Sequence, residues 1–121
     1  MPWKMTAVVT HTVLIKRKEK EKMKKLFISQ PMKDKTNEEI LAVREKAIQS
    51  AKKRLGEDVE VIDSFFKDAP HDARPLWFLG KSFELLSTAD IAYFAKGWDQ
   101  YRGCRMEQRA CMDYEIEALY E

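Results

Sequence analysis

The sequence has few of the residues that build metal centres and cross-linked domains. Its 121 residues include two cysteines and two histidines. His11 and His71 are far apart and lack the short spacing of zinc ligands, so we expect no metal site. There is no G-x-G-x-x-G or P-loop pattern, and no serine or cysteine has a credible histidine base. These absences predict a chain that works without a metal or an organic cofactor.

Long apolar runs and a strong charge of one sign are missing as well. No run approaches the ~20 apolar residues that cross a bilayer. The 22 basic and 20 acidic residues leave a net charge of +2, without the basic stripe of a protein that binds DNA or RNA. With 45% apolar and 35% charged residues, the composition is that of a globular domain. We expect neither a membrane nor a polymeric nucleic acid as a partner.

The two cysteines do not favour a disulfide. Cys104 and Cys111 are seven residues apart and are expected on one face of the same helix. They would then lie about 10 Å apart along that helix, which is too far for an S–S bond. Reduced thiols are typical of a cytoplasmic protein, which is the location we expect.

The first 22 residues differ from the rest in composition. The run KRKEKEK at residues 16–22 contains only Lys, Arg and Glu, all of which can be written with purine-only codons. A translated ribosome-binding stretch would have this composition, so we expect Met23 to be the natural start and residues 1–22 to be an extension. The alternative is a solvated basic arm. The folded domain is predicted to span residues 23–121.

Apolar runs and helix signals alternate along that domain. Thr36 and Glu39 form a capping box, Gly56 ends the helix that follows, and Pro75 suits the first turn of another. Strands are predicted at 25–29, 59–63, 90–95 and 116–120, with helices at 36–55, 75–86 and 103–114. This alternation predicts an α/β fold, with a four- to five-stranded parallel sheet covered by helices on both faces.

Parallel sheets place their sites beyond the carboxyl ends of the strands, where the strand order reverses. Three segments are expected there: SQPM after the first strand, DSFF after the second and KGWDQYRG after the third. Ser29 and Gln30 are candidates for hydrogen bonds to sugar hydroxyls, or else form the turn before Pro31. Asp63 points toward the crevice by topology. The other candidate ligand contacts in these segments are Pro31, Gly97, Trp98 and Tyr101.

Two of those candidates have structural alternatives. The Trp98 ring can stack on a base or a sugar, or it can anchor the core. Tyr101 has the same two interpretations. Asp90, at the start of the third strand, is most simply a residue whose carboxylate accepts a hydrogen bond from a neighbouring backbone amide.

The start of the last helix is a candidate anion site. The free amides of Gly103 and Cys104, with the cation of Arg102 beside them, suit a phosphate or a carboxylate. Glu107 follows Gly103 by one helical turn and lies on the same side. A carboxylate there suits a nucleophile that attacks an anomeric carbon and forms a covalent glycosyl intermediate. The alternative is a surface glutamate paired with Arg105 or Arg109.

Three stretches resemble the nucleoside 2-deoxyribosyltransferase-like superfamily, most closely its small phage and bacterial branch. They are FISQPM at 27–32, STAD before the third strand, and GWDQYRGCRMEQRA at 97–110. The resemblance covers residues 24–121 and implies a flavodoxin-like three-layer sandwich. It also implies cleavage of the N-glycosidic bond of deoxynucleosides or their monophosphates, by a glutamate four residues after a glycine. Gly103 and Glu107 match that spacing.

The family resemblance also implies a homo-oligomer, because a neighbouring subunit often completes the site. The aromatic side chains expected at that contact are Trp77, Phe78 and Trp98. The implied small-molecule partner is a nucleoside or a nucleotide.

The chain departs from the family pattern at three positions. Phe27 replaces a tyrosine, Tyr101 replaces an aspartate or a phosphate-binding serine, and Ser82 replaces the general-acid aspartate. General acid catalysis typically contributes ~10²–10⁴ in rate, so the last change is the most consequential. Either another acid protonates the leaving base, or the chain binds a nucleotide without cleaving it. The candidate acids are Asp63, Asp99 and Glu84.

Overall fold

The computed structural model describes residues 23–64, 66 and 68–121. The expectation for residues 1–22 lies outside this part of the chain. The elements, in chain order, are β1 (Lys24–Ser29), α2 (Asn37–Leu55), β2 (Val59–Val61), α3 (Pro75–Leu86), β3 (Ile91–Phe94), the 3-10 turn η1 (Trp98–Gln100), α4 (Arg102–Asp113) and β4 (Glu117–Tyr120). The predicted strands and helices are confirmed, with ends that differ by one or two residues. The turn η1 was not predicted.

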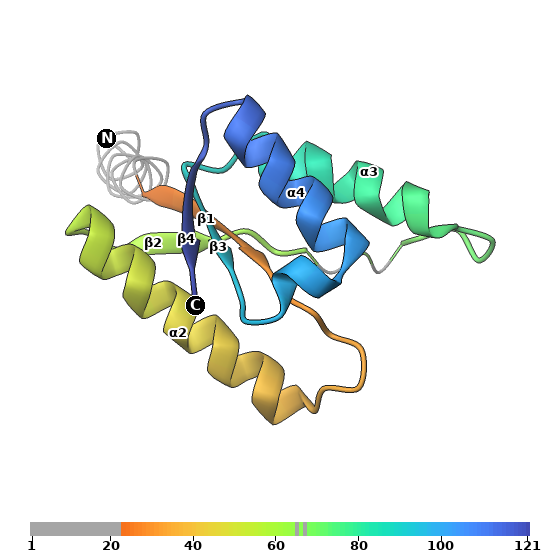
Figure 1. Cartoon of the computed structure of the whole chain (residues 1–121), viewed down its shortest axis with the longest axis horizontal. Helices are drawn as coiled ribbons and strands as arrows, with labels where there is room; N and C mark the ends of the chain where they lie inside the picture. Colours follow the sequence, from red (N-terminus) through yellow and green to blue (C-terminus); the bar gives the residue numbers. More distant parts are fainter. Residues whose placement is uncertain (1–22, 65, 67) are drawn as a thin grey trace, which may run out of the picture.

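The four strands form one parallel sheet in the order β2-β1-β3-β4. Helix α2 covers one face of the sheet, and α3 and α4 cover the other (Figure 1). This arrangement confirms the predicted α/β fold, a flavodoxin-like three-layer sandwich.

Local signals fix the ends of the longest helix. The amide of Glu39 donates to Oγ1 of Thr36 (3.1 Å), as the capping box requires. At the other end Gly56 has φ 71° and its amide donates to the carbonyl of Lys52 (2.7 Å), so a residue that tolerates the left-handed region closes the helix. Among the helices in the described ranges, none combines the length and the apolarity that crossing a membrane demands.

Each face of the sheet has its own apolar cluster. Leu26, Ala47, Ala51, Ile91 and Tyr93 form the cluster under α2. Phe27, Leu86, Ala92, Phe94 and Cys111 form the cluster under α3 and α4. All four residues of β3 are buried, as expected of a strand with a neighbour on each side and helices on both faces.

Asp90 sets the register between the two central strands. Its Oδ2 accepts from the amide of Lys25 (2.8 Å), and its own amide donates to the carbonyl of Lys25 (2.9 Å). These two hydrogen bonds fix the parallel register in which Leu26 pairs with Ile91 and Ser29 pairs with Phe94. The interpretation of Asp90 as a partner of a neighbouring backbone amide is confirmed.

Candidate functional site

The strand order reverses between β1 and β3, so the segments that follow these strands lie side by side. The amide of Ala95, just after β3, donates to the carbonyl of Ser29, the last residue of β1 (2.9 Å). Gly97 turns the chain there with φ 89°, a value that favours glycine. Helices α2, α3 and α4 all begin at this edge of the sheet, which places their free amides around it.

Glu107 is the one charged residue that is buried in the described part of the chain. It is 8% exposed and lies on the face of α4 that also buries Cys104 and Cys111. The Ser29 hydroxyl donates to its Oε1 over 3.0 Å, across 78 positions of sequence. The carboxyl therefore lies between α4 and the end of the sheet.

The alternative interpretation of Glu107 as a surface ion-pair partner is wrong. The Nη1 of Arg105 donates to the carbonyl of Asp99 (3.1 Å). The Nε of Arg109 pairs with Asp113 on the exposed side of α4 (3.1 Å). Both arginines point their charge to the surface, whereas the carboxyl faces inward.

Burial changes the acid–base properties of this cluster. It raises the pKa of Glu107 from 4.5 to about 7, and the hydrogen bond from Ser29 partly opposes that rise. Burial also raises the pKa of Cys104, and it raises that of Cys111 to about 11. Both thiols are free and protonated at neutral pH, so neither suits a nucleophile. Glu107 is the group in this cluster that changes charge near neutrality.

Open space lies at Gly103, at the start of α4. Tyr101 precedes the helix without a side-chain hydrogen bond to its first turn. A Cβ added to Gly103 would meet no atom within 4 Å. Gly103 is one turn before Glu107 on the same side of the helix. Glu107 itself is not among the residues that line the pocket at Gly103.

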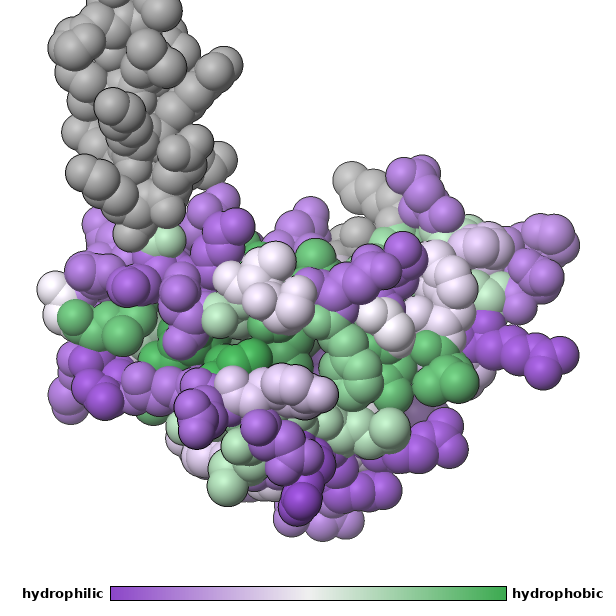
Figure 2. Space-filling model, turned by 90° about the horizontal axis from the view of Figure 1, so that it is seen from above, coloured by the Kyte–Doolittle hydropathy of each residue, from purple (hydrophilic) through white to green (hydrophobic). Residues whose placement is uncertain are grey.

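That space belongs to a pocket between the starts of α3 and α4, which we call the arginine pocket. It has a volume of about 600 Å³. Its lining residues are Arg74, Pro75, Leu76, Leu79, Arg102, Gly103 and Met106. Sequence reasoning found Arg102 and Gly103 but missed Arg74, although an arginine directly before a helix-starting proline at this edge was a usable signal. Figure 2 shows this face of the molecule, where apolar residues form a band between hydrophilic ones.

A second pocket, the switch-point pocket, lies where β1 and β3 end, on the side of α2. It has a volume of about 410 Å³. Its lining residues are Gln30, Pro31, Lys35, Glu39, Ile40, Val43, Ala95, Lys96, Gly97 and Glu121. Three predicted ligand contacts, Gln30, Pro31 and Gly97, thus lie together.

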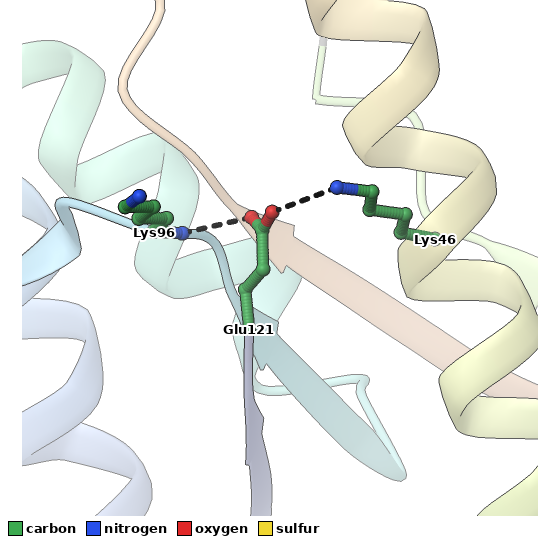
Figure 3. Close-up of polar contacts among 3 residues, drawn as sticks. All are labelled: Lys46, Lys96 and Glu121. Carbon is green, nitrogen blue, oxygen red and sulfur yellow. Dashed lines mark hydrogen bonds and ion pairs between the residues drawn. The ribbon is translucent and has the colours of Figure 1, made fainter.

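Glu121 fixes one wall of the switch-point pocket (Figure 3). Its Oε1 accepts from the amide of Lys96 (2.9 Å), and its Oε2 accepts from Nζ of Lys46 on α2 (3.3 Å). These contacts hold the pKa of Glu121 below its usual range, chiefly through the hydrogen bond from the Lys96 amide. The end of β4 is thereby tied to the turn after β3, a contact that sequence reasoning did not find.

The predicted site residues therefore divide into groups. Ser29 and Cys104 lie against Glu107, whereas Tyr101 is exposed in front of α4. Asp63 is an exposed residue of the segment that follows β2. The Trp98 ring packs against Phe94 and Tyr120, with centroids 5.6 Å away in both cases, as its interpretation as a core anchor predicts.

No family model matches the chain, and no curated protein or solved structure is significantly similar to it.

Proposed function

We propose that the chain is a member of the nucleoside 2-deoxyribosyltransferase-like superfamily that cleaves or transfers the N-glycosidic bond of a (deoxy)nucleoside or its monophosphate. Glu107 is the nucleophile. The observation that carries the proposal is this buried carboxyl, held by Ser29 at the reversal point of the sheet, with open space at Gly103. The spacing from Gly103 to Glu107, which the family resemblance singles out, supports it.

The reaction proceeds by two displacements at the anomeric carbon. A carboxylate oxygen of Glu107 forms a bond to that carbon as the bond to the base nitrogen breaks, and the base leaves with the electron pair and takes a proton from a general acid. Water or a second base then displaces Glu107 from the glycosyl group. Attack requires the ionised carboxylate, so the reactive fraction of the protein rises as pH passes through about 7.

The arginine pocket supports a monophosphate as substrate. Arg74 and Arg102 bring two guanidinium groups to a pocket whose other walls are largely apolar. Guanidinium groups bind phosphate through paired hydrogen bonds, and the amides that start α4 add a further anion contact. In this proposal Asp63 contacts the sugar and is the first candidate for the proton donor. Gln30, which the sequence also suggested for the sugar, lines the switch-point pocket on the α2 side instead.

A second function, nucleotide binding without cleavage, is favoured by the state of Glu107. Burial raises the pKa of this carboxyl to about 7, which favours its protonated form, and a protonated carboxyl is a poor nucleophile. All three acids named as proton donors, Asp63, Asp99 and Glu84, are exposed, and Glu84 pairs with Lys81.

Release of free base decides between the two functions. The protein is incubated with deoxynucleosides and with their 5′-monophosphates, and the products are separated by chromatography. Glu107→Gln is expected to lower turnover by about 10³-fold or more, because it removes the attacking oxygen. Glu57→Gln, a change of an exposed glutamate after α2, is the matched control and keeps full turnover.

Two results would contradict the enzymatic proposal. Turnover in Glu107→Gln equal to that of the wild type would exclude Glu107 as the nucleophile. Nucleotide binding without base release, unchanged in Glu107→Gln, would establish the silent binder instead.

A further inference from the structure

Ser29 and Glu107 are the two buried polar residues of the described core. Ser29 is the last residue of β1 and is 2% exposed. Its side chain lies on the same face of the sheet as Phe27, two residues earlier, which packs in the cluster under α4. Burying a serine and a glutamate is unfavourable unless they are hydrogen-bonded, and here each satisfies the other.

The Ser29 hydroxyl is already committed to the protein. A serine has one hydroxyl proton, and in Ser29 this proton is donated to Oε1 of Glu107. The same proton is not available to a sugar hydroxyl while this bond exists. The 2% exposure of Ser29 also leaves it almost no surface for a ligand. Ser29 therefore acts on Glu107, through this hydrogen bond, rather than on the sugar as the sequence suggested.

The two oxygens of the Glu107 carboxyl have different surroundings. Within the described part of the chain, every fully buried side-chain oxygen and nitrogen has a hydrogen-bond partner. Oε1 has Ser29 as its donor, and none of the described residues donates to Oε2. Oε2 therefore belongs to the exposed 8% of Glu107. The open space at Gly103 lies on the same side of the helix.

We infer that Ser29 is a positioning residue, which holds Oε1 of Glu107 so that Oε2 is the oxygen presented to the substrate. The effect of Ser29 on the reaction rests on the proposed function, whereas the hydrogen bond that positions Glu107 does not. A carboxylate held at one oxygen loses rotation about its last bond. The attacking oxygen then stays near one position, which lowers the entropic part of the barrier.

The groups packed beside Glu107 bring no positive charge, and the two arginines of the arginine pocket are not among the causes of its pKa shift. On α4 these are the thiols of Cys104 and Cys111, both neutral because burial raises their pKa. From β3 and α3 the neighbours in the cluster are apolar, Phe94 and Leu86. Ser29 is therefore the described hydrogen-bond donor that favours the ionised carboxylate. Cys104 interacts with the same hydroxyl, which lowers the pKa of its thiol and partly opposes the rise caused by burial.

The test measures the protonation of Glu107 directly. The carboxyl carbon of Glu107 is followed by NMR from pH 5 to pH 10 in ¹³C-labelled protein, with its signal assigned by Glu107→Gln. In Ser29→Ala the titration midpoint of Glu107 is expected to rise by roughly one pH unit, because the carboxylate loses the hydroxyl that donates to it. In Ser29→Thr, which keeps a hydroxyl, the midpoint stays near the wild-type value. The control is Ser50→Ala, which removes a hydroxyl that interacts with Tyr93 on the opposite face of the sheet.

Base release is then measured over the same pH range. Ser29→Ala is expected to shift the pH dependence of base release to higher pH, by the same amount as the NMR midpoint of Glu107. It is also expected to lower kcat more than it changes KM. Ser29→Thr restores both. An unchanged NMR midpoint in Ser29→Ala overturns the inference. If the NMR midpoint moves but even the wild type releases no base, the positioning of Glu107 by Ser29 is supported and the proposed reaction is excluded.

A second pair of variants covers the case in which Ser29→Ala does not fold. Ser29→Thr keeps a strong donor at this position, and Ser29→Cys replaces it with a weak one. The inference requires a higher midpoint in Ser29→Cys than in Ser29→Thr. Equal midpoints in the two variants overturn it.

Discussion

Folding favours the neutral form of the Glu107 side chain. The pKa of this carboxyl is about 7 in the folded chain and 4.5 when unperturbed, so between these values the folded state binds more protons than the unfolded state. The contribution of Glu107 to stability is complete below pH 4.5 and is lost as pH rises through about 7. Such a shift corresponds to roughly 3 kcal/mol in total.

This difference predicts how Glu107→Gln changes stability with pH. The glutamine is similar in shape but has no charge to bury. Relative to the wild type, the variant is expected to gain roughly 2–3 kcal/mol of unfolding free energy between pH 5 and pH 8. Denaturant unfolding at several pH values measures the gain. A gap between variant and wild type that stays constant over this range would show that Glu107 does not titrate near neutrality.

At the scale of the element, the start of α4 has an open position where another helix would carry a side chain. Gly103 and Gly80 lie on α4 and α3, and a Cβ added at either would meet nothing within 4 Å. Alanine is the better helix former of the two residues. Alanine therefore fits at both positions, so a substitution at Gly103 tests whether a ligand uses the empty space there.

Paired substitutions test that use. Gly103→Ala and Gly80→Ala are both expected to leave the unfolding free energy unchanged or to raise it by up to about 1 kcal/mol. Gly103→Ala is also expected to lower base release at least several-fold, because its methyl group stands in the approach to Glu107. Thermal unfolding and chromatography measure the two effects. Equal turnover in both variants would show that the substrate does not pass Gly103.

The elements themselves were predictable because their signals are local. Thr36 and Glu39 cap α2, Gly56 closes it, and Pro75 starts α3, each through contacts within a few residues. The contacts that shape the site are not local. Ser29 reaches Glu107 across 78 positions, and Glu121 reaches Lys46 across 75. A single sequence carries no signal for such pairs. The spacing from Gly103 to Glu107 could therefore be recognised, whereas the hydrogen bond between Ser29 and Glu107 could not be predicted.

Topology predicted the edge of the sheet where the site lies, but not its division into two pockets. Gln30 and Gly97 line the pocket on the α2 side, whereas Arg102 and Gly103 line the one between α3 and α4. The two pockets are separate because successive side chains of a strand point to opposite faces of the sheet. The side chain of Ser29 points toward α4, whereas Gln30 lines the pocket on the α2 side. Arg74 was missed because it is brought to α4 only by the packing of two helices.

At the scale of the whole molecule, the face formed by α3 and α4 is the region that we propose for contact with a second copy. Leu76 is 73% exposed, Met106 41% and Phe78 38%. Phe78 and Trp77 pack edge to face, which gives the start of α3 a rigid aromatic surface. Trp98, the third aromatic residue expected there, packs against Phe94 and Tyr120 instead.

Substitution of exposed residues on that face tests the oligomer. Leu76→Glu combined with Phe78→Glu is expected to convert an oligomer into a monomer, because two charges would be buried without partners. Sedimentation measures the mass at several concentrations, and Leu41→Glu, a change of an exposed leucine on α2, is the control. A wild-type chain that sediments as a monomer at high concentration would exclude a stable oligomer.

The order of the strands also determines when Glu107 loses contact with water during synthesis. The first two strands and the helix between them are complete once residue 61 has been made, whereas β3 begins thirty residues later and α4 follows it. Until α4 docks, the acid is hydrated and ionised at the pH of the cell. Docking of α4 therefore brings a proton uptake with it, and Glu107 acquires its near-neutral titration in this late step.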